Sequence, residues 1–380
     1  MSVAARPSGV PRSPGSRTAA NTADAASSAG TTASSAGSAA SGRDAAGHRG
    51  TGRRAGLLLL TLVVLAVACA ASVAVGARPI APGTVWEAFT AFDPANGDHA
   101  VVHSRVPRTV LGLVTGAALG LAGAAMQGVA RNPLADPGIL GVNAGAAFAV
   151  VLGIYIFGIT NLNGYIWFAL AGAAGAAVVV YLVASLGREG ATPVKLALAG
   201  AALSAGLMSL LSAVLVSSQQ TLDTFRFWQV GSVSGRNWDT IVAVLPFLAA
   251  GAVIAVFAGR ALNGLSLGDD VARGLGQRVG LTRGITALGV VLLCGAATAA
   301  AGPIAFIGLV IPHVVRSFTG PDYRWILPFS MLLAPALLVT ADVVGRVLLP
   351  PGEIPVGVTT AVIGAPVFIW LVRRRKLAEL

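Results

Sequence analysis

The sequence contains few charged residues. Asp, Glu, Lys and Arg make up only 11% of its 380 residues, whereas 55% of the residues are hydrophobic. An average soluble domain contains about 25% charged residues, and a chain this poor in them cannot cover a core of this size with polar surface. The composition therefore excludes a soluble globular protein and predicts a membrane protein.

The residue types that carry most enzyme and metal chemistry are also scarce or wrongly spaced. The two cysteines, Cys69 and Cys294, and the four histidines lack the spacing of a zinc site or a disulfide framework. Neither of the two lysines, Lys195 and Lys376, follows a glycine, as the lysine of a phosphate-binding loop must. We therefore predict no catalytic residue, no cofactor and no metal site, and we expect that the chain is not an enzyme.

The chain contains instead a series of uncharged segments, each long enough to cross a bilayer. About 20 residues at a rise of 1.5 Å cross a hydrocarbon core of about 30 Å. Seven segments meet this length, and they are residues 57–77, 109–130, 138–159, 164–187, 196–220, 240–259 and 325–341. Residues 284–315 are too long for one crossing, so we predict that Gly302 and Pro303 divide them into two helices. With a last segment at 354–372, the sequence predicts about ten helices.

The distribution of basic residues predicts the orientation. With the N-terminus in the cytoplasm, fifteen basic residues between positions 53 and 376 fall on the inner side and six on the outer side. This bias predicts a multi-pass protein of the plasma membrane with both termini in the cytoplasm. It also accounts for the net charge of +11 without nucleic-acid binding.

Three regions differ in composition. Residues 1–52 consist mostly of Ala, Ser, Gly and Thr and lack apolar periodicity, which is typical of a disordered tail. Residues 53–376 form the predicted ten-helix domain, and residues 377–380 a short C-terminal tail. Within the domain, the glycine-rich stretch 261–283 is the longest predicted cytoplasmic loop, and its composition suits short helices joined by turns.

Several long motifs follow one another in the loops and at the predicted helix ends. They are Arg105-Val-Pro-Arg108, Arg131-Asn-Pro-Leu-Ala-Asp-Pro-Gly, Leu267-Gly-Asp-Asp-Val-Ala-Arg273-Gly, the run 301–313 that ends in Ile-Pro-His313, and Glu353-Ile-Pro-Val-Gly357. In these motifs the chain resembles the permease subunit of type II ABC importers for iron siderophores, haem and cobalamin, the FecCD-type family. The resemblance covers roughly residues 57–375.

The resemblance implies a fold and a set of partners. The fold is an all-α polytopic membrane protein with about ten transmembrane helices, the type II ABC importer permease fold. The partners are a second permease subunit in a homodimer or heterodimer, cytoplasmic ATPase subunits, and an external substrate-binding protein. Because this chain has no phosphate-binding loop, ATP hydrolysis would occur on the ATPase subunits.

The resemblance also implies roles for individual residues. Three arginines would engage acidic side chains of the binding protein, and they are Arg105, Arg108 and Arg346. Alternatively, these arginines pair with Asp342 and Glu353 of the same chain. Within the loop 261–283, the residues that would couple to the ATPase are Leu265, Leu267, Gly268, Asp269, Asp270, Ala272, Arg273, Leu275 and Gly276.

A pathway for a large hydrated ligand would be lined by small or weakly polar side chains. Candidates are Gln127, Asn143, Ser204, Ser209 and Ser212, together with the segment Thr192, Pro193 and Val194, where some family members carry small hydroxyl residues. None of these residues identifies the ligand. We expect an importer of a ferric siderophore, with haem or cobalamin as the alternative. An ion-coupled secondary transporter is a further alternative. It would usually carry carboxylates within its spans, and here the spans have none apart from Asp342 and Glu353 near the outer ends.

Overall fold

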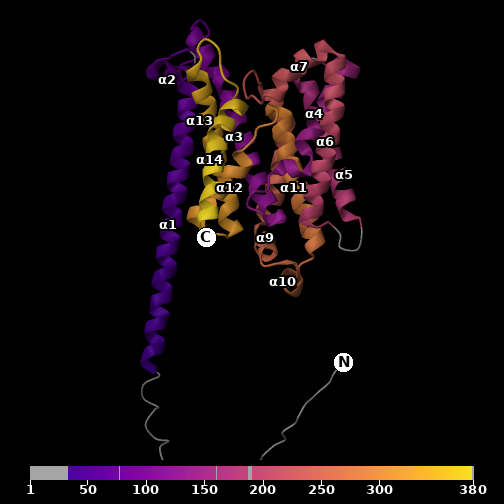
Figure 1. Cartoon of the computed structure of the whole chain (residues 1–380). Coiled ribbons are helices and arrows are strands. Elements are labelled where there is room, and N and C mark those ends of the chain that lie inside the picture. The colour runs from indigo at the N-terminus through magenta and orange to yellow at the C-terminus, as the bar shows by residue number, and fades with distance from the viewer. Residues whose placement is uncertain (1–32, 77, 160, 187–190, 379–380) are drawn as a thin grey trace, which may run out of the picture. The chain divides into compact units, whose positions relative to one another are not determined.

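The structure of the protein is a computed structural model that describes residues 33–76, 78–159, 161–186 and 191–378. These residues contain helices and connecting loops and no strand (Figure 1). The chain divides into two units, residues 1–55 and residues 56–380. The expected disordered tail lies in the first unit, where residues 1–32 are outside the described residues. Residues 33–52, however, are helical and continuous with the apolar part of α1 (Ala33–Ala74), and this differs from the expectation.

The second unit is a helical bundle built mainly from apolar helices. Within the described residues, seven helices are long and apolar enough to cross a membrane by length and composition, and three more are apolar but shorter. They are α1 (Ala33–Ala74), α3 (Gly97–Ala130), α4 (Val142–Phe157), α5 (Leu162–Ser185), α6 (Pro193–Ser217), α8 (Trp238–Phe257), α11 (Val279–Ala301), α12 (Ile307–Thr319), α13 (Tyr323–Leu348) and α14 (Val356–Ala378). Each corresponds to one predicted span, so the prediction of about ten helices is confirmed.

The long uncharged segment 284–315 is divided where predicted. α11 ends at Ala301, and Gly302 has a φ of 76°, a conformation that glycine adopts without strain. α12 begins after Phe306, which itself has a φ of 68°. Pro303 lies in the connecting loop, where its missing N–H removes no helical hydrogen bond.

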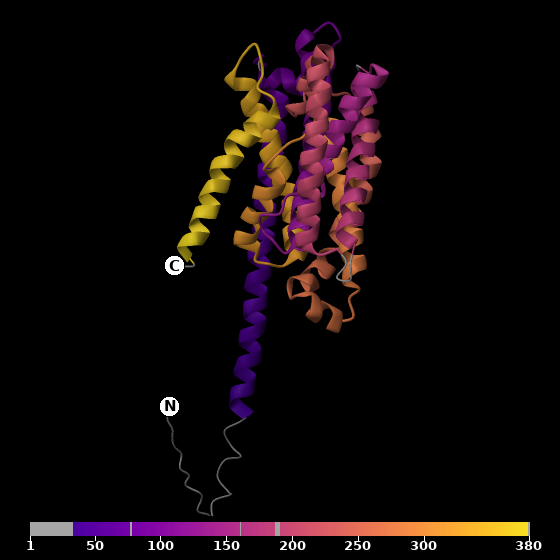
Figure 2. The same cartoon turned by 45° about the vertical axis from the view of Figure 1, so that its right-hand side comes forward.

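Five short helices lie at the two ends of the bundle or in its loops. They are α2 (Pro82–Thr90), η1 (Pro137–Leu140), α7 (Gln219–Gln229), α9 (Gly259–Ser266) and α10 (Asp269–Gly274). α2 and α7 lie at one end of the bundle, and α9 and α10 lie at the opposite end, as both views show (Figures 1 and 2). We call these the α2 end and the α10 end.

α3 lies in the middle of the bundle and packs against α11, α12 and α13. Its glycines allow this close approach. A Cβ atom at Gly116 would meet the backbone of Pro335, and one at Gly123 would meet the backbone of Gly308. Small residues let helices approach closely in lipid, so the Gly- and Ala-rich sequence serves tight packing here.

Candidate functional sites

A cluster of charged side chains joins three helices at the α2 end. Arg108 on α3 donates two hydrogen bonds to the carboxylate of Asp342 on α13, of 2.9 and 2.6 Å, and a third of 2.7 Å to Glu353. Asp342 is buried and also lies 3.2 Å from the Nε atom of Arg346, one turn further along α13. One buried carboxylate thus neutralises two arginines, which removes much of the cost of burying them.

Two arginines of the cluster, Arg105 and Arg346, bind the end of α1 and the residues just after it. Arg105 donates hydrogen bonds to the carbonyl oxygens of Val73, Ala74 and Arg78, at 2.8 to 3.0 Å. Arg346 donates to the carbonyl and hydroxyl oxygens of Ser72, at 3.0 Å each. Both arginines are buried. Carbonyl groups at a helix end that lack an intrahelical partner are strong acceptors for guanidinium groups, so these hydrogen bonds offset the cost of burying the charge.

The structure therefore brings the three arginines with a predicted docking role into one place, but it also gives them partners within the chain. The alternative, that the arginines pair with Asp342 and Glu353, agrees with the contacts of Arg108 with both carboxylates and of Arg346 with Asp342. The helices extend beyond the predicted spans at residues 109 and 341, since α3 begins at Gly97 and α13 continues to Leu348. Charged residues can lie inside these helices because they neutralise one another. Whether a binding protein docks here stays a prediction.

A cavity of about 790 Å³ opens beside this cluster, between α5, α7 and the loops that precede α8 and α14. Polar and charged side chains that line it are Tyr165, Asp223, Ser232, Ser234, Arg236 and Glu353. Burial lowers the pKa of Arg236 to about 10, against a smaller opposing effect of Tyr165. The Nε atom of Arg236 is buried and has no hydrogen-bond partner among the described residues. Sequence reasoning missed Arg236 as a site residue, because nothing in its neighbourhood distinguishes it from any other loop arginine.

Glu353 connects the cavity to the arginine cluster. Burial alone would raise its pKa, but hydrogen bonds with Ser234 and Arg108 and the charge of Arg108 lower the pKa of Glu353 overall. This carboxylate is therefore held in its charged form next to the cavity.

At the α10 end, the segment predicted to couple to an ATPase folds into α9 and α10, the short helices that its composition suggested. Its residues divide between two faces. Leu265 and Ala272 are fully buried, whereas Leu267 and Leu275 are exposed by 62% and 66%. Gly268 and Gly276 form the turns at either end of α10, with φ values of 106° and 82° that favour glycine.

The two acidic residues of α10 also point in different directions. Asp269 accepts two hydrogen bonds from Arg283 on α11, of 3.0 and 2.8 Å, and lies 3.4 Å from Arg131 at the end of α3. Asp270 is exposed and pairs with Arg273 at 2.9 Å within α10. Asp269 thus attaches α10 to the bundle, while Asp270 and Arg273 belong to its outer surface.

The structure shows what the predicted pathway residues contact within this chain, and their role in a pathway stays a prediction. Gln127 is buried and donates to the carbonyl oxygen of Leu309 at 3.2 Å, and Asn143 accepts from Thr298 at 3.1 Å, so both act as packing residues between helices. Thr192 caps α6 by accepting from the backbone N–H of Lys195 at 3.4 Å. The remaining two residues of this segment start the helix, with Pro193 in the first turn and Val194 exposed.

No group of three His, Cys, Asp or Glu side chains that could hold a metal ion occurs in the part of the chain that the structure describes. The arrangement is that of a multi-pass helical membrane protein with polar sites at both ends of its bundle. A sequence model of the FecCD transport family matches residues 62–374. The chain belongs to this family.

Two bacterial relatives each cover 84% of this chain. The probable siderophore transport system permease protein YfiZ of Bacillus subtilis strain 168 is 46% identical, over 84% of this chain and 96% of its own length. The ferric enterobactin transport system permease protein FepD of Escherichia coli K12 is 49% identical, over 84% of this chain and 94% of its own length. A solved inward-facing transporter assigned to the metal-chelate ABC type matches with a TM-score of 0.74 at 28% identity, over 84% of this chain and 99% of that structure's chain.

Proposed function

We propose that this chain is the permease subunit of an ABC importer that carries a ferric siderophore across the plasma membrane. The observation that carries the proposal is the similarity to two permeases that are named for siderophore and ferric enterobactin transport. The similarity covers 84% of this chain and nearly the full length of each relative. Membership of the FecCD transport family and the all-helical fold support the same conclusion.

The distribution of basic residues supports an orientation with both termini and the α10 end in the cytoplasm. There, cytoplasmic ATPase subunits would bind α10 and its flanking turns. Leu267, Val271 and Leu275 support this role, because they expose apolar side chains on a segment that also carries the charged pair Asp270 and Arg273. Exposed apolar groups next to charges are typical of protein interfaces.

An external binding protein would then dock at the α2 end. Three arginines face two carboxylates in the cluster there, so the cluster has a positive excess for an acidic partner. Arg108 is the residue best placed to contact it, since its pairing with Glu353 is partly exposed, whereas Arg105 and Arg346 are held inside.

A second permease subunit would complete the pathway. α6 supports this proposal, because only 11% of its most apolar window is buried within the single chain. The serines Ser204, Ser209 and Ser212 lie on this helix, and an apposed α6 would turn them toward a shared channel.

The proposal is tested by uptake into cells that lack the gene and carry either the normal chain or a variant. The assay supplies labelled ferric siderophore, haem or cobalamin. We expect the normal chain to restore uptake of the siderophore only. Restored uptake of haem or cobalamin alone would overturn the siderophore assignment, and no restored uptake of any of them would overturn the importer.

A matched pair of variants tests coupling in the same assay. Gly276 has a φ of 82°, whereas Gly274 lies in α10 with no positive φ, and at neither position would an added Cβ atom meet another heavy atom within 4 Å. Alanine in a left-handed conformation costs about 1–2 kcal/mol, so Gly276→Ala should displace the turn and reduce uptake several-fold. Gly274→Ala should leave uptake within about twofold, because alanine favours a helix. Equal uptake by both variants would contradict a coupling role for this turn.

A further inference from the structure

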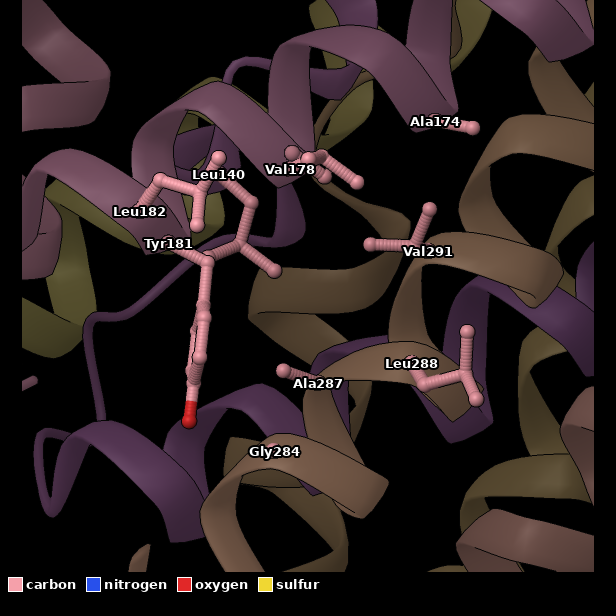
Figure 3. Close-up of a pocket in the computed structure, with 10 residues that line it drawn as sticks. Leu140, Ala174, Val178, Tyr181, Leu182, Gly284, Ala287, Leu288 and Val291 are labelled. Carbon is pink, nitrogen blue, oxygen red and sulfur yellow. The ribbon is translucent and has the colours of Figure 1, made fainter. Parts of the chain in front are cut away.

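An apolar groove runs between α5 and α11 near the α10 end. It has a volume of about 260 Å³ and is lined almost entirely by aliphatic side chains, including Val178 and Leu182 from α5 and Leu288 and Val291 from α11 (Figure 3). Val178, Leu182 and Leu288 are each more than half exposed, so the groove opens on the outer surface of the bundle.

A second cavity, of about 370 Å³, lies at the end of this groove. It is lined by charged and polar side chains, including Arg273, Arg278, Arg283 and Asp269. Tyr181 lines both cavities, and its hydroxyl points toward Gly284, at the start of α11 (Figure 3). A Cβ atom at Gly284 would lie 3.2 Å from this hydroxyl oxygen. The apolar groove and the polar cavity are therefore one continuous amphipathic site.

The polar cavity carries more positive than negative charge. Three arginines and one carboxylate, Asp269, line it. Arg283 pairs with Asp269, which Arg131 also neutralises from outside the cavity, and Arg273 pairs with the exposed Asp270. The side chain of Arg283 is 5% exposed, and its Nε atom has no hydrogen-bond partner within the described ranges. Nor does any described carboxylate form an ion pair with Arg278.

The start of α11 adds to this positive potential. No side chain caps α11, so the backbone N–H groups of its first turn lack a side-chain acceptor. Unpaired N–H groups at a helix start and the helix dipole attract anions. Gly280 of this first turn lines the same cavity.

We propose that this site binds an anionic glycerophospholipid. Its phosphate lies among Arg273, Arg278 and Arg283, and one acyl chain lies in the groove between α5 and α11. Arginine is suited to phosphate because its planar N–H groups donate in pairs, and basic pockets between transmembrane helices bind lipid headgroups. A free anion would make no favourable contact with the apolar groove. A soluble protein would not reach a groove that follows the transmembrane helices.

The site is connected to α10 through a single side chain. Arg283 lines the headgroup cavity and also holds Asp269, the residue that attaches α10 to the bundle. A bound phosphate would therefore help to fix the side chain that positions α10. The lipid site itself does not depend on the proposed substrate or on the identity of the ATPase.

The test measures lipid retained by the full chain, purified from nanodiscs of phosphatidylcholine with or without phosphatidylglycerol, by native mass spectrometry. Two variants alter the two parts of the site at exposed positions, Arg278→Ala in the cavity and Val178→Trp at the groove. Arg260→Ala is the matched control, an exposed arginine at the same end that lines neither cavity.

We expect the normal chain and Arg260→Ala to retain phosphatidylglycerol in preference to phosphatidylcholine. Arg278→Ala should reduce this retention about fivefold, the contribution of one basic residue near an anionic lipid surface. Val178→Trp should reduce it as well, because the indole ring occupies the acyl-chain groove.

Equal retention of both lipids would show nonspecific lipid contact and overturn the proposal. Displacement by inorganic phosphate with no effect of Val178→Trp would show a free-anion site and overturn it too. A loss of ATPase binding in Arg278→Ala with unchanged lipid retention would assign the cavity to the ATPase instead.

Discussion

α3 and α6 are both apolar, both rich in Gly and Ala, and both long enough to cross a membrane, yet they occupy opposite environments. In α3, 78% of the most apolar window is buried, compared with 11% in α6. The difference lies in what most of the glycines contact. Gly123 of α3 lies against the backbone of Gly308, whereas a side chain at Gly206 of α6 would meet nothing within 4 Å. Gly200, in the second turn of α6, is the glycine of that helix that lies against backbone, at Ile139. Since lipid is as apolar as the protein interior, close backbone packing rather than hydropathy distinguishes a central helix from a peripheral one.

The largest expected effect comes from reversing this difference with one substitution. Gly123→Leu forces a side chain into the backbone of α12, and Gly206→Leu places the same side chain in open space. Overpacking of a tight core costs typically 1–3 kcal/mol, and more when the obstacle is backbone. We expect little folded Gly123→Leu protein by size-exclusion chromatography in detergent, and a normal yield of Gly206→Leu subunit. A normal yield of both would show that α3 can move away from α12.

A second prediction concerns the buried charges that α3 carries and that α6 lacks beyond its first turn. Asp342→Ala leaves Arg108 and Arg346 without their shared carboxylate, and removing one partner of a buried ion pair typically costs about 3–5 kcal/mol. We expect a large decrease in the Tm of the detergent-solubilised protein. An unchanged Tm would mean that water or Glu353 replaces the lost carboxylate.

Glu353→Gln is the matched control for Asp342→Ala, because the Glu353 side chain is 37% exposed. A partly exposed ion pair contributes less than about 1 kcal/mol, so the Tm should fall only slightly. The pKa of Glu353 is lowered in the folded protein, so its contribution is present above the usual carboxyl pKa and is lost as the pH falls through the lowered value. The Tm difference between the normal chain and Glu353→Gln should therefore disappear in acid. A difference that persists there would assign the effect to packing.

The smallest effect on folding is expected for cysteines on the exposed side of α6. These cysteines test directly whether α6 lies at a subunit interface. Ala202, Ser209 and Val216 lie seven residues apart on one face and are exposed. In a chain whose Cys69 and Cys294 are replaced by alanine, single cysteines at these positions should change stability by less than about 0.5 kcal/mol. At least one should form an intersubunit disulfide on oxidation of native membranes, seen as a dimer on a nonreducing gel. A cysteine at Val179, exposed on α5, serves as the control.

Crosslinking at Val179 but at none of the α6 positions would place the subunit interface on α5 and contradict the proposed role of α6. An adduct with a different permease, in place of the dimer of this chain, would show a heterodimer with the same interface.

The ten apolar helices and the break at Gly302 could be predicted because both depend on local sequence. The ends of α3 and α13 could not, because the rule that charges end a span fails when the charges neutralise one another. Arg108 and Asp342 are 234 positions apart, and no local pattern indicates that they meet. The helical start of α1 was missed for another reason, since low apolar periodicity argues against packing but not against an alanine-rich helix.

For the candidate sites, the sequence predicted several of the residues but not the contacts that these residues make. The segment around α10 was found from its motif and its glycines, but only the tertiary structure separates Asp269, which faces Arg283, from Asp270 next to it. The arginine cluster was found as three residues, whereas the acceptors of Arg105 and Arg346 are backbone and hydroxyl oxygens of α1, which no sequence pattern specifies. The pathway residues were chosen for polarity, and in the single chain Gln127 and Asn143 use that polarity to join helices.

α3 has a length of 34 residues, so it is about 51 Å long, well beyond the hydrocarbon thickness of a bilayer. Its internal proline, Pro107, lies in the third turn, and no proline interrupts the remaining part from Arg108 to Ala130. One end carries the arginines that bind α1 and α13, and the other ends at Arg131, which contacts Asp269 of α10. A helix without such an interruption does not shorten or bend sharply, so a displacement at Arg108 becomes a displacement at Arg131. This single rod connects the two surfaces of the membrane mechanically, without any charge or ligand having to cross between them.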